Sequence, residues 1–84
     1  MGAPEIRNEL RSYILNEFLP GESADNLLDD TPLRTSGVLD SIKLLQLVNH
    51  IESTYSIAIE AHEAGNVANF DTIEAIAEMI AGKR

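Results

Sequence analysis

The sequence contains no cysteine and no tryptophan, and its aromatic content is only 5%. The lack of cysteine excludes disulfide bonds, thiolate metal sites and a cysteine nucleophile within the chain. A core must instead be built mainly from Ile, Leu, Val and Ala, which suffice because hydrophobic residues make up 44% of the sequence. Apolar runs are short as well, so there is no candidate membrane span and no signal-peptide core, and we expect the protein in the cytoplasm.

Basic residues are also scarce: six Lys and Arg stand against fourteen Asp and Glu, which gives a formal net charge of −8. Negative charge repels the phosphates of nucleic acids and anionic membranes, so we expect neither as a partner. It favours association with basic patches on other proteins. The length of 84 residues indicates one domain over residues 1–84, which we expect to be monomeric, with a net stability of about 4–13 kcal/mol.

Apolar residues at helical spacing predict an all-α fold, a bundle of three main helices and one short helix. The main helices are expected at residues 4–19, 41–55 and 71–82, and the short helix at about 61–67. The last main helix has the clearest start, since Asp71 is followed three positions later by Glu74, as in a capping box. Asp71 is therefore the expected N-cap.

Between the first two main helices, residues 20–40 form a long loop rich in Gly, Ser, Asp, Thr and Pro. Loops of this length are uncommon in compact domains unless they are functional or disordered. Apolar residues such as Leu27, Leu33 and Leu39 argue against disorder, because they can anchor the loop on the bundle. Residues 57–59, Ile-Ala-Ile, lack a second strand to pair with, and we expect a linker whose isoleucines enter the core.

The segment Gly37-Val38-Leu39-Asp40-Ser41-Ile42 places a serine hydroxyl where this loop enters the second main helix. The free N–H groups and the dipole at a helix start favour a negatively charged substituent, and a hydroxyl there can stay accessible to a modifying enzyme. The simpler interpretation is that Asp40 and Ser41 only cap the helix. Leu39 and Ile42 either anchor the loop or contact a partner.

The same segment resembles the phosphopantetheine attachment site of the acyl carrier and peptidyl carrier protein family, in which Asp-Ser follows a Gly and two further residues and precedes Leu, Ile or Met. The resemblance extends over about residues 6–80 and includes Asn69-Phe70-Asp71-Thr72-Ile73. It implies a carrier fold of four helices. It also implies that a phosphopantetheinyl transferase attaches 4'-phosphopantetheine, taken from coenzyme A, to Ser41.

The resemblance further implies that Asp40 positions the metal of the transferase and caps the helix. The thiol of the arm would hold an acyl or aminoacyl group as a thioester. The chain would then be a non-catalytic carrier whose partner enzymes do the chemistry.

Two positions depart from the carriers of bacterial fatty-acid synthesis, which usually have acids where this chain has Lys43 and Gln46. Leu44 also stands where a small polar residue is common. These departures favour a stand-alone carrier loaded by a dedicated adenylating acyl or aminoacyl ligase, or one serving a polyketide or specialised lipid synthase, over a housekeeping fatty-acid carrier. The expected partner-facing residues are Leu39, Ile42, Lys43, Leu44 and Gln46, although Leu44 also fits the core. An unmodified acidic protein-interaction module is the alternative from a different class.

We find no metal or catalytic constellation in the sequence. His50 and His62 are too far apart for the ligand spacing of a zinc site, and we expect surface or packing roles for them. Asp25, Asp29 and Asp30 lack the glycine and the closing glutamate of an EF-hand loop, which indicates a solvated loop.

Overall fold

The computed structural model describes residues 4–83, which form three long helices, two one-turn helices and a 3-10 turn, with no strand among them. The elements are α1 (Pro4–Phe18), η1 (Ala24–Asn26), α2 (Ser41–Tyr55), α3 (Ala61–Ala64), α4 (Val67–Phe70) and α5 (Ile73–Lys83). The expected all-α bundle is confirmed, and α1 and α2 lie where the apolar spacing placed them.

The short third helix is in fact two helices. Asn66 interrupts the segment, because its side-chain oxygen accepts a hydrogen bond from Ala68 N (3.1 Å) and so caps α4 as a new helix. Glu60 and Glu63 form a capping box at the start of α3, and Gly65 ends that helix. The hydrogen bond from a capping side chain competes with the backbone hydrogen bonds that would continue the helix, which explains the break at Asn66.

The start of α5 also differs from the expectation. Thr72, not Asp71, caps the helix, since its hydroxyl oxygen accepts a hydrogen bond from Ala75 N (3.0 Å). The Asp71 carboxylate is instead bonded to the first loop, through Arg34 N and Thr35 N. At the other end, α5 continues through Gly82 to Lys83.

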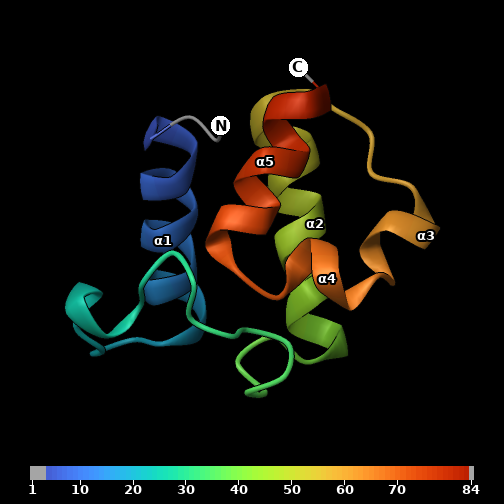
Figure 1. The fold of residues 1–84 in the computed structure, drawn as a ribbon. Helices are drawn as coiled ribbons and strands as arrows, with labels where there is room; N and C mark the ends of the chain where they lie inside the picture. The colour runs from blue at the N-terminus through green and yellow to red at the C-terminus, as the bar shows by residue number, and fades with distance from the viewer. Residues whose placement is uncertain (1–3, 84) are drawn as a thin grey trace.

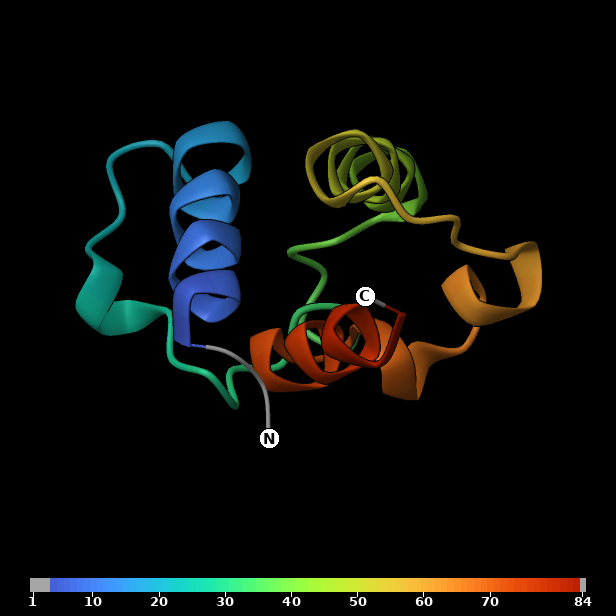
Figure 2. The same ribbon diagram turned by 90° about the horizontal axis from the view of Figure 1, so that it is seen from above.

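The helices surround one apolar centre. α1 packs against α5, α4 packs against α5, and α3 packs against α4 (Figure 1). Figure 2 looks along α2 and shows α1 and α3 on opposite sides of the molecule. The long first loop runs along the end of the bundle at which α1 ends and α2 begins (Figure 1). The start of α2 is therefore a place where loop and bundle meet.

The core consists of buried apolar side chains from α1, the loop, α2, α4 and α5. They are Ile6, Leu10, Ile14, Phe18, Leu27, Leu33, Leu39, Leu44, Leu47, Val48, Ile51, Phe70, Ile73, Ile76, Ala77 and Ile80. Three loop leucines belong to this set, so the loop is anchored as expected. Ile57 and Ile59 pack against the core but are only partly buried. None of the described helices has the length and apolarity needed to cross a membrane.

Candidate functional site

Ser41 is the first residue of α2, and its side chain is exposed. Asp40 is the N-cap: its Oδ1 accepts a hydrogen bond from Lys43 N (2.8 Å), and its backbone oxygen accepts one from Leu44 N (2.8 Å). The Ser41 hydroxyl has no hydrogen-bond partner within residues 4–83. Asp40 therefore does the capping, and the serine oxygen is available for chemistry.

The loop before Ser41 is folded back on itself. Leu39 N donates to Leu33 O (2.9 Å), which brings the two ends of this stretch together, and both side chains are buried. Gly37 lies between these two leucines in the sequence and has a φ of +87°. This backbone conformation is less strained for glycine than for residues with a Cβ atom. The buried Leu33 and Leu39 thus fix the backbone just before Asp40 and Ser41.

Asp71 ties this loop to the junction of α4 and α5. Its Oδ1 accepts hydrogen bonds from Arg34 N (3.0 Å), Thr35 N (3.1 Å) and the Thr35 hydroxyl (3.2 Å), and its backbone oxygen accepts one from Leu33 N (2.6 Å). These bonds favour the charged carboxylate, so they lower the pKa of Asp71, the backbone bond from Thr35 contributing most.

Two of the expected partner-facing residues lie in the core, which is the alternative that the sequence also offered for each of them. Leu39 and Leu44 are only 2% and 8% exposed, because both side chains point into the core. Ile42 is 70% exposed, Lys43 is partly exposed and Gln46 is exposed. The last three therefore lie on the surface beside Ser41.

Leu45 is an exposed residue that the sequence analysis did not single out. It is 62% exposed and lies one helical turn after Ile42, so the two side chains share one side of α2. The opposite stripe of α2 is buried through Leu44, Leu47, Val48 and Ile51. α2 therefore carries two apolar stripes: one builds the core, and the other faces outward next to Ser41.

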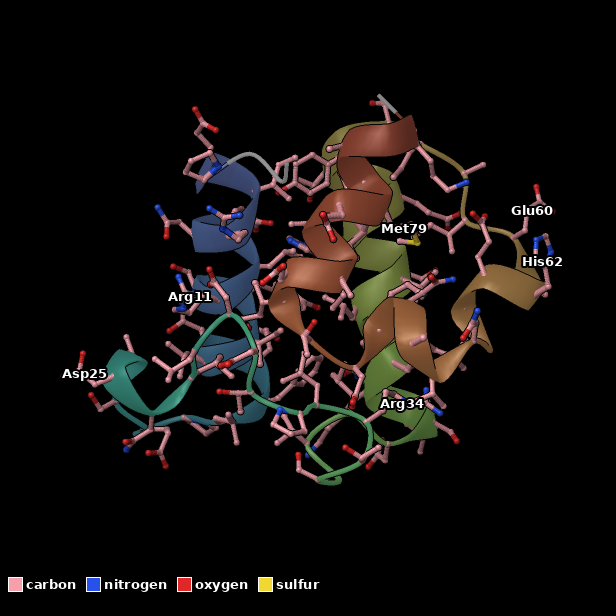
Figure 3. The ribbon with its side chains drawn as sticks, in the orientation of Figure 1. Arg11, Asp25, Arg34, Glu60, His62 and Met79 are labelled. Atoms are coloured by element: carbon pink, nitrogen blue, oxygen red, sulfur yellow. The ribbon has the colours of Figure 1, made fainter. Side chains whose placement is uncertain are left out.

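The surroundings of Ser41 suit an anionic substituent. No acid lies in the first turn of α2, and among the described residues Lys43 has no carboxylate ion-pair partner. Arg34 carries a buried Nη1 without a hydrogen-bond partner in the part of the chain described, and Figure 3 places Arg34 at the end of the bundle where α2 begins. A helix N-terminus with nearby cations can hold a phosphate group, so these residues fit one.

His50 has a packing role, as the sequence reasoning expected. Its Nε2 lies 2.8 Å from Glu9 Oε2, and its ring stacks on Tyr13 with centroids 3.8 Å apart. The Tyr55 hydroxyl donates to Glu9 Oε1 (2.9 Å). This cluster links α1 to α2. The pKa of Tyr13 is raised, mainly by burial and further by the negative charges of Glu17 and Glu9.

The remaining candidate ligands do not gather into a metal site. His62 is exposed on α3, on the side of the molecule opposite α1 (Figure 3), and residues 4–83 contain no group of three or more side chains that could hold a metal ion. Asp25 is exposed, as expected of a solvated loop. Asp29 instead pairs with Arg7 (3.2 Å) and Arg11, so its carboxylate helps fix the loop on α1.

Comparison with known proteins gave two findings. The sequence profile of the "Phosphopantetheine attachment site" family matches residues 15–80. A solved structure described as "Crystal structure of FAD-dependent dehydrogenase" contains a chain that superposes with a TM-score of 0.75 at 35% sequence identity, over 84% of this chain and 97% of that chain. The search of curated proteins gave no match.

Proposed function

Because this chain belongs to the phosphopantetheine attachment site family, we propose that Ser41 is the residue that carries its 4'-phosphopantetheine arm. The observation that supports this most is the position of the hydroxyl. It is exposed, unbonded within the described residues and located at the first position of a fifteen-residue helix. In this proposal the carrier domain covers residues 1–84, of which 4–83 are described.

The attachment breaks the phosphoanhydride bond of coenzyme A and forms a phosphodiester. The Ser41 oxygen forms the new bond to phosphorus, coenzyme A loses its nucleotide part as the leaving group, and the serine proton passes to a base of the transferase. The product is a phosphodiester with one negative charge next to the N-terminus of α2. The helix dipole and Lys43 lower the energy of that charge.

The arm supplies a terminal thiol, which the chain itself lacks. An acyl or aminoacyl group held there as a thioester can be carried between enzymes in the cytoplasm. The chain provides the tether and a docking surface, and its partner enzymes provide the reactive groups. A dedicated biosynthetic pathway agrees better with Lys43 and Gln46 than a housekeeping fatty-acid pathway does.

We propose that partners dock on Ile42, Leu45 and the polar residues beside them. The two apolar side chains are exposed one turn apart and would be buried by a shallow apolar depression on the partner. Lys43 and Gln46 flank them, and a carboxylate on the partner would complement Lys43. The expected partners are a phosphopantetheinyl transferase and the adenylating ligase or synthase that loads or uses the arm.

One further partner class has an observation in its favour. The matched chain of the FAD-dependent dehydrogenase structure is covered almost completely by this short chain. It is therefore itself of carrier size. We propose that a flavin-dependent dehydrogenase oxidises the group tethered here: a base takes the proton on Cα, the flavin takes a hydride from Cβ, and an α,β-unsaturated thioester and a reduced flavin result.

The carrier proposal is tested by incubating the chain with coenzyme A, Mg²⁺ and a promiscuous phosphopantetheinyl transferase and measuring intact mass. We expect the addition of one phosphopantetheinyl group to wild type, none to Ser41→Ala, and a normal addition to the control Ser53→Ala, which changes another exposed serine of α2. Modification of Ser41→Ala would show that another residue is the attachment site. An unmodified wild type would favour the interaction module.

The dehydrogenase proposal has its own test. The modified chain is loaded with a saturated acyl group and mixed with the dehydrogenase of the matched structure, and the flavin absorbance is followed. Bleaching with the loaded chain, and none with the unloaded chain, is the expected result. A flavin that stays oxidised with every acyl chain length from propionyl to octanoyl would contradict this partner assignment and leave the carrier proposal intact.

A further inference from the structure

Asp71 is far from Ser41 in the sequence but is bonded to the loop that leads to it. One carboxylate oxygen receives three hydrogen bonds, from two consecutive backbone N–H groups and one hydroxyl of residues 34–35. The backbone oxygen of Asp71 receives a fourth bond, from Leu33 N. These four hydrogen bonds join the segment 33–35 to one residue at the junction of α4 and α5, in addition to the burial of the Leu33 side chain in the core.

The restraint extends along the loop to the start of α2. Leu33 O accepts the N–H of Leu39, which is the residue before the N-cap Asp40. Arg34 O accepts the N–H of Gly37 (3.2 Å), so the intervening turn is closed as well. Two hydrogen-bonded steps therefore connect the Asp71 carboxylate to the backbone that enters α2.

Asp71 has no second task that would explain its position. Thr72 caps α5, so the carboxylate is not needed there. Among the described residues Asp71 has no cationic ion-pair partner either. Its observed bonds all go to the loop.

We infer that Asp71 is a positioning residue for the modification of Ser41: it holds the loop in the one arrangement that presents the serine and its N-cap to the transferase. The inference rests on the proposed function, because it assumes that Ser41 is modified. Without the Asp71 bonds the loop would sample other arrangements, and only the fraction in the binding-competent one would be recognised. The reacting oxygen itself would be unchanged.

This predicts a specific kinetic signature. If about one tenth of the Asp71→Ala molecules keep the loop arrangement that the transferase binds, the KM for the carrier should rise by about tenfold. The kcat should stay within about twofold of wild type, because the reacting groups are unchanged. Asp71→Asn should show a smaller rise, because its amide oxygen can still accept the N–H bonds, although more weakly than a carboxylate does. A smaller rise in KM for Asp71→Asn than for Asp71→Ala would link the rise to the lost hydrogen bonds.

A matched variant separates positioning from general destabilisation. Ile80→Val removes one methyl group from a fully buried side chain near the other end of α5, away from the loop. Thermal unfolding identifies a temperature at which all variants are folded, and the transferase kinetics are then measured at that temperature with coenzyme A and Mg²⁺. Ile80→Val should keep the wild-type KM.

Amide hydrogen exchange supplies a second readout, at the N–H groups of Thr35 and Leu39. Both should exchange faster in Asp71→Ala and not in Ile80→Val. A folded Asp71→Ala chain with wild-type KM, or an Ile80→Val chain whose KM rises equally, would overturn the inference. A wild-type chain that is never modified would instead overturn the proposed function, so the two failures are distinguishable.

Discussion

Asp40 has one task that the structure shows and one that the proposed function assigns to it, and two substitutions can separate them. The observed task is to cap α2 through the bond from Lys43 N to Oδ1. The proposed task is to help position the metal of the transferase. Asp40→Ala removes both the oxygen and the charge, whereas Asp40→Asn keeps a capping oxygen and removes only the charge.

The size of the capping effect follows from the geometry of one hydrogen bond at a helix start. Replacing such a cap by alanine costs about 1 kcal/mol, whereas Asn caps about as well as Asp. For a domain of this length, about 1 kcal/mol lowers Tm by roughly 4–8 °C. We therefore expect this loss of Tm in Asp40→Ala and almost none in Asp40→Asn.

The assay combines thermal unfolding with transferase kinetics on the same samples. Because an amide is a poorer ligand for Mg²⁺ than a carboxylate, Asp40→Asn should lose at least tenfold in kcat/KM of modification while it keeps its Tm. Asp30→Asn is the control, since it removes an exposed loop carboxylate without touching α2. Wild-type modification of Asp40→Asn would refute the metal role, and wild-type stability of Asp40→Ala would refute the capping argument.

Three further outcomes are expected. The hydrogen bonds to Asp71 lower its pKa below the ordinary value of 3.8, so they stabilise the folded protein above pH 3.8, and this stabilisation is lost as the pH falls through the lower pKa of the folded protein. In urea unfolding from pH 6 to pH 2, the free energy of unfolding should therefore fall less for Asp71→Asn than for wild type. An equal fall in both proteins would contradict this. Leu39→Ala should cost about 2–5 kcal/mol in urea unfolding, because it empties a fully packed site; a cost below about 1 kcal/mol would show that the loop anchor is dispensable. Ile42→Ala and Leu45→Ala should leave the Tm nearly unchanged, since both side chains are exposed, yet slow the loading or consuming enzyme, and loss of neither rate would contradict the docking surface.

The helices could be read from the sequence because their signals are local. Apolar spacing located α1 and α2, and the sequence offered Asp40 or Ser41 as the cap of α2, of which the structure shows Asp40. The resemblance around Ser41 was local too, and it identified the family that the profile match then confirmed.

The errors arise where residues far apart in the chain meet. Asp71 looked like a helix cap because Glu74 follows it, but the loop residues that it binds are more than thirty positions earlier. The contact of Glu9 with His50 spans a similar distance and has no periodic signal. Long-range partners of polar residues were therefore not predictable from spacing.

The assignment of α2 side chains to core or surface was also beyond the sequence. Leu44 and Leu45 are the same residue type in adjacent positions, yet one is buried and the other is exposed. Only the side of α2 that faces the shared core decides between them.

The central claim is that an exposed serine oxygen at the start of α2 accepts the phosphopantetheine arm. Intact-mass measurement of a chain treated with coenzyme A and transferase, followed by peptide mapping, tests it most directly. We expect one added group, located on the peptide that contains Ser41. A treated chain whose mass does not change, or an added group on any other peptide, would contradict it.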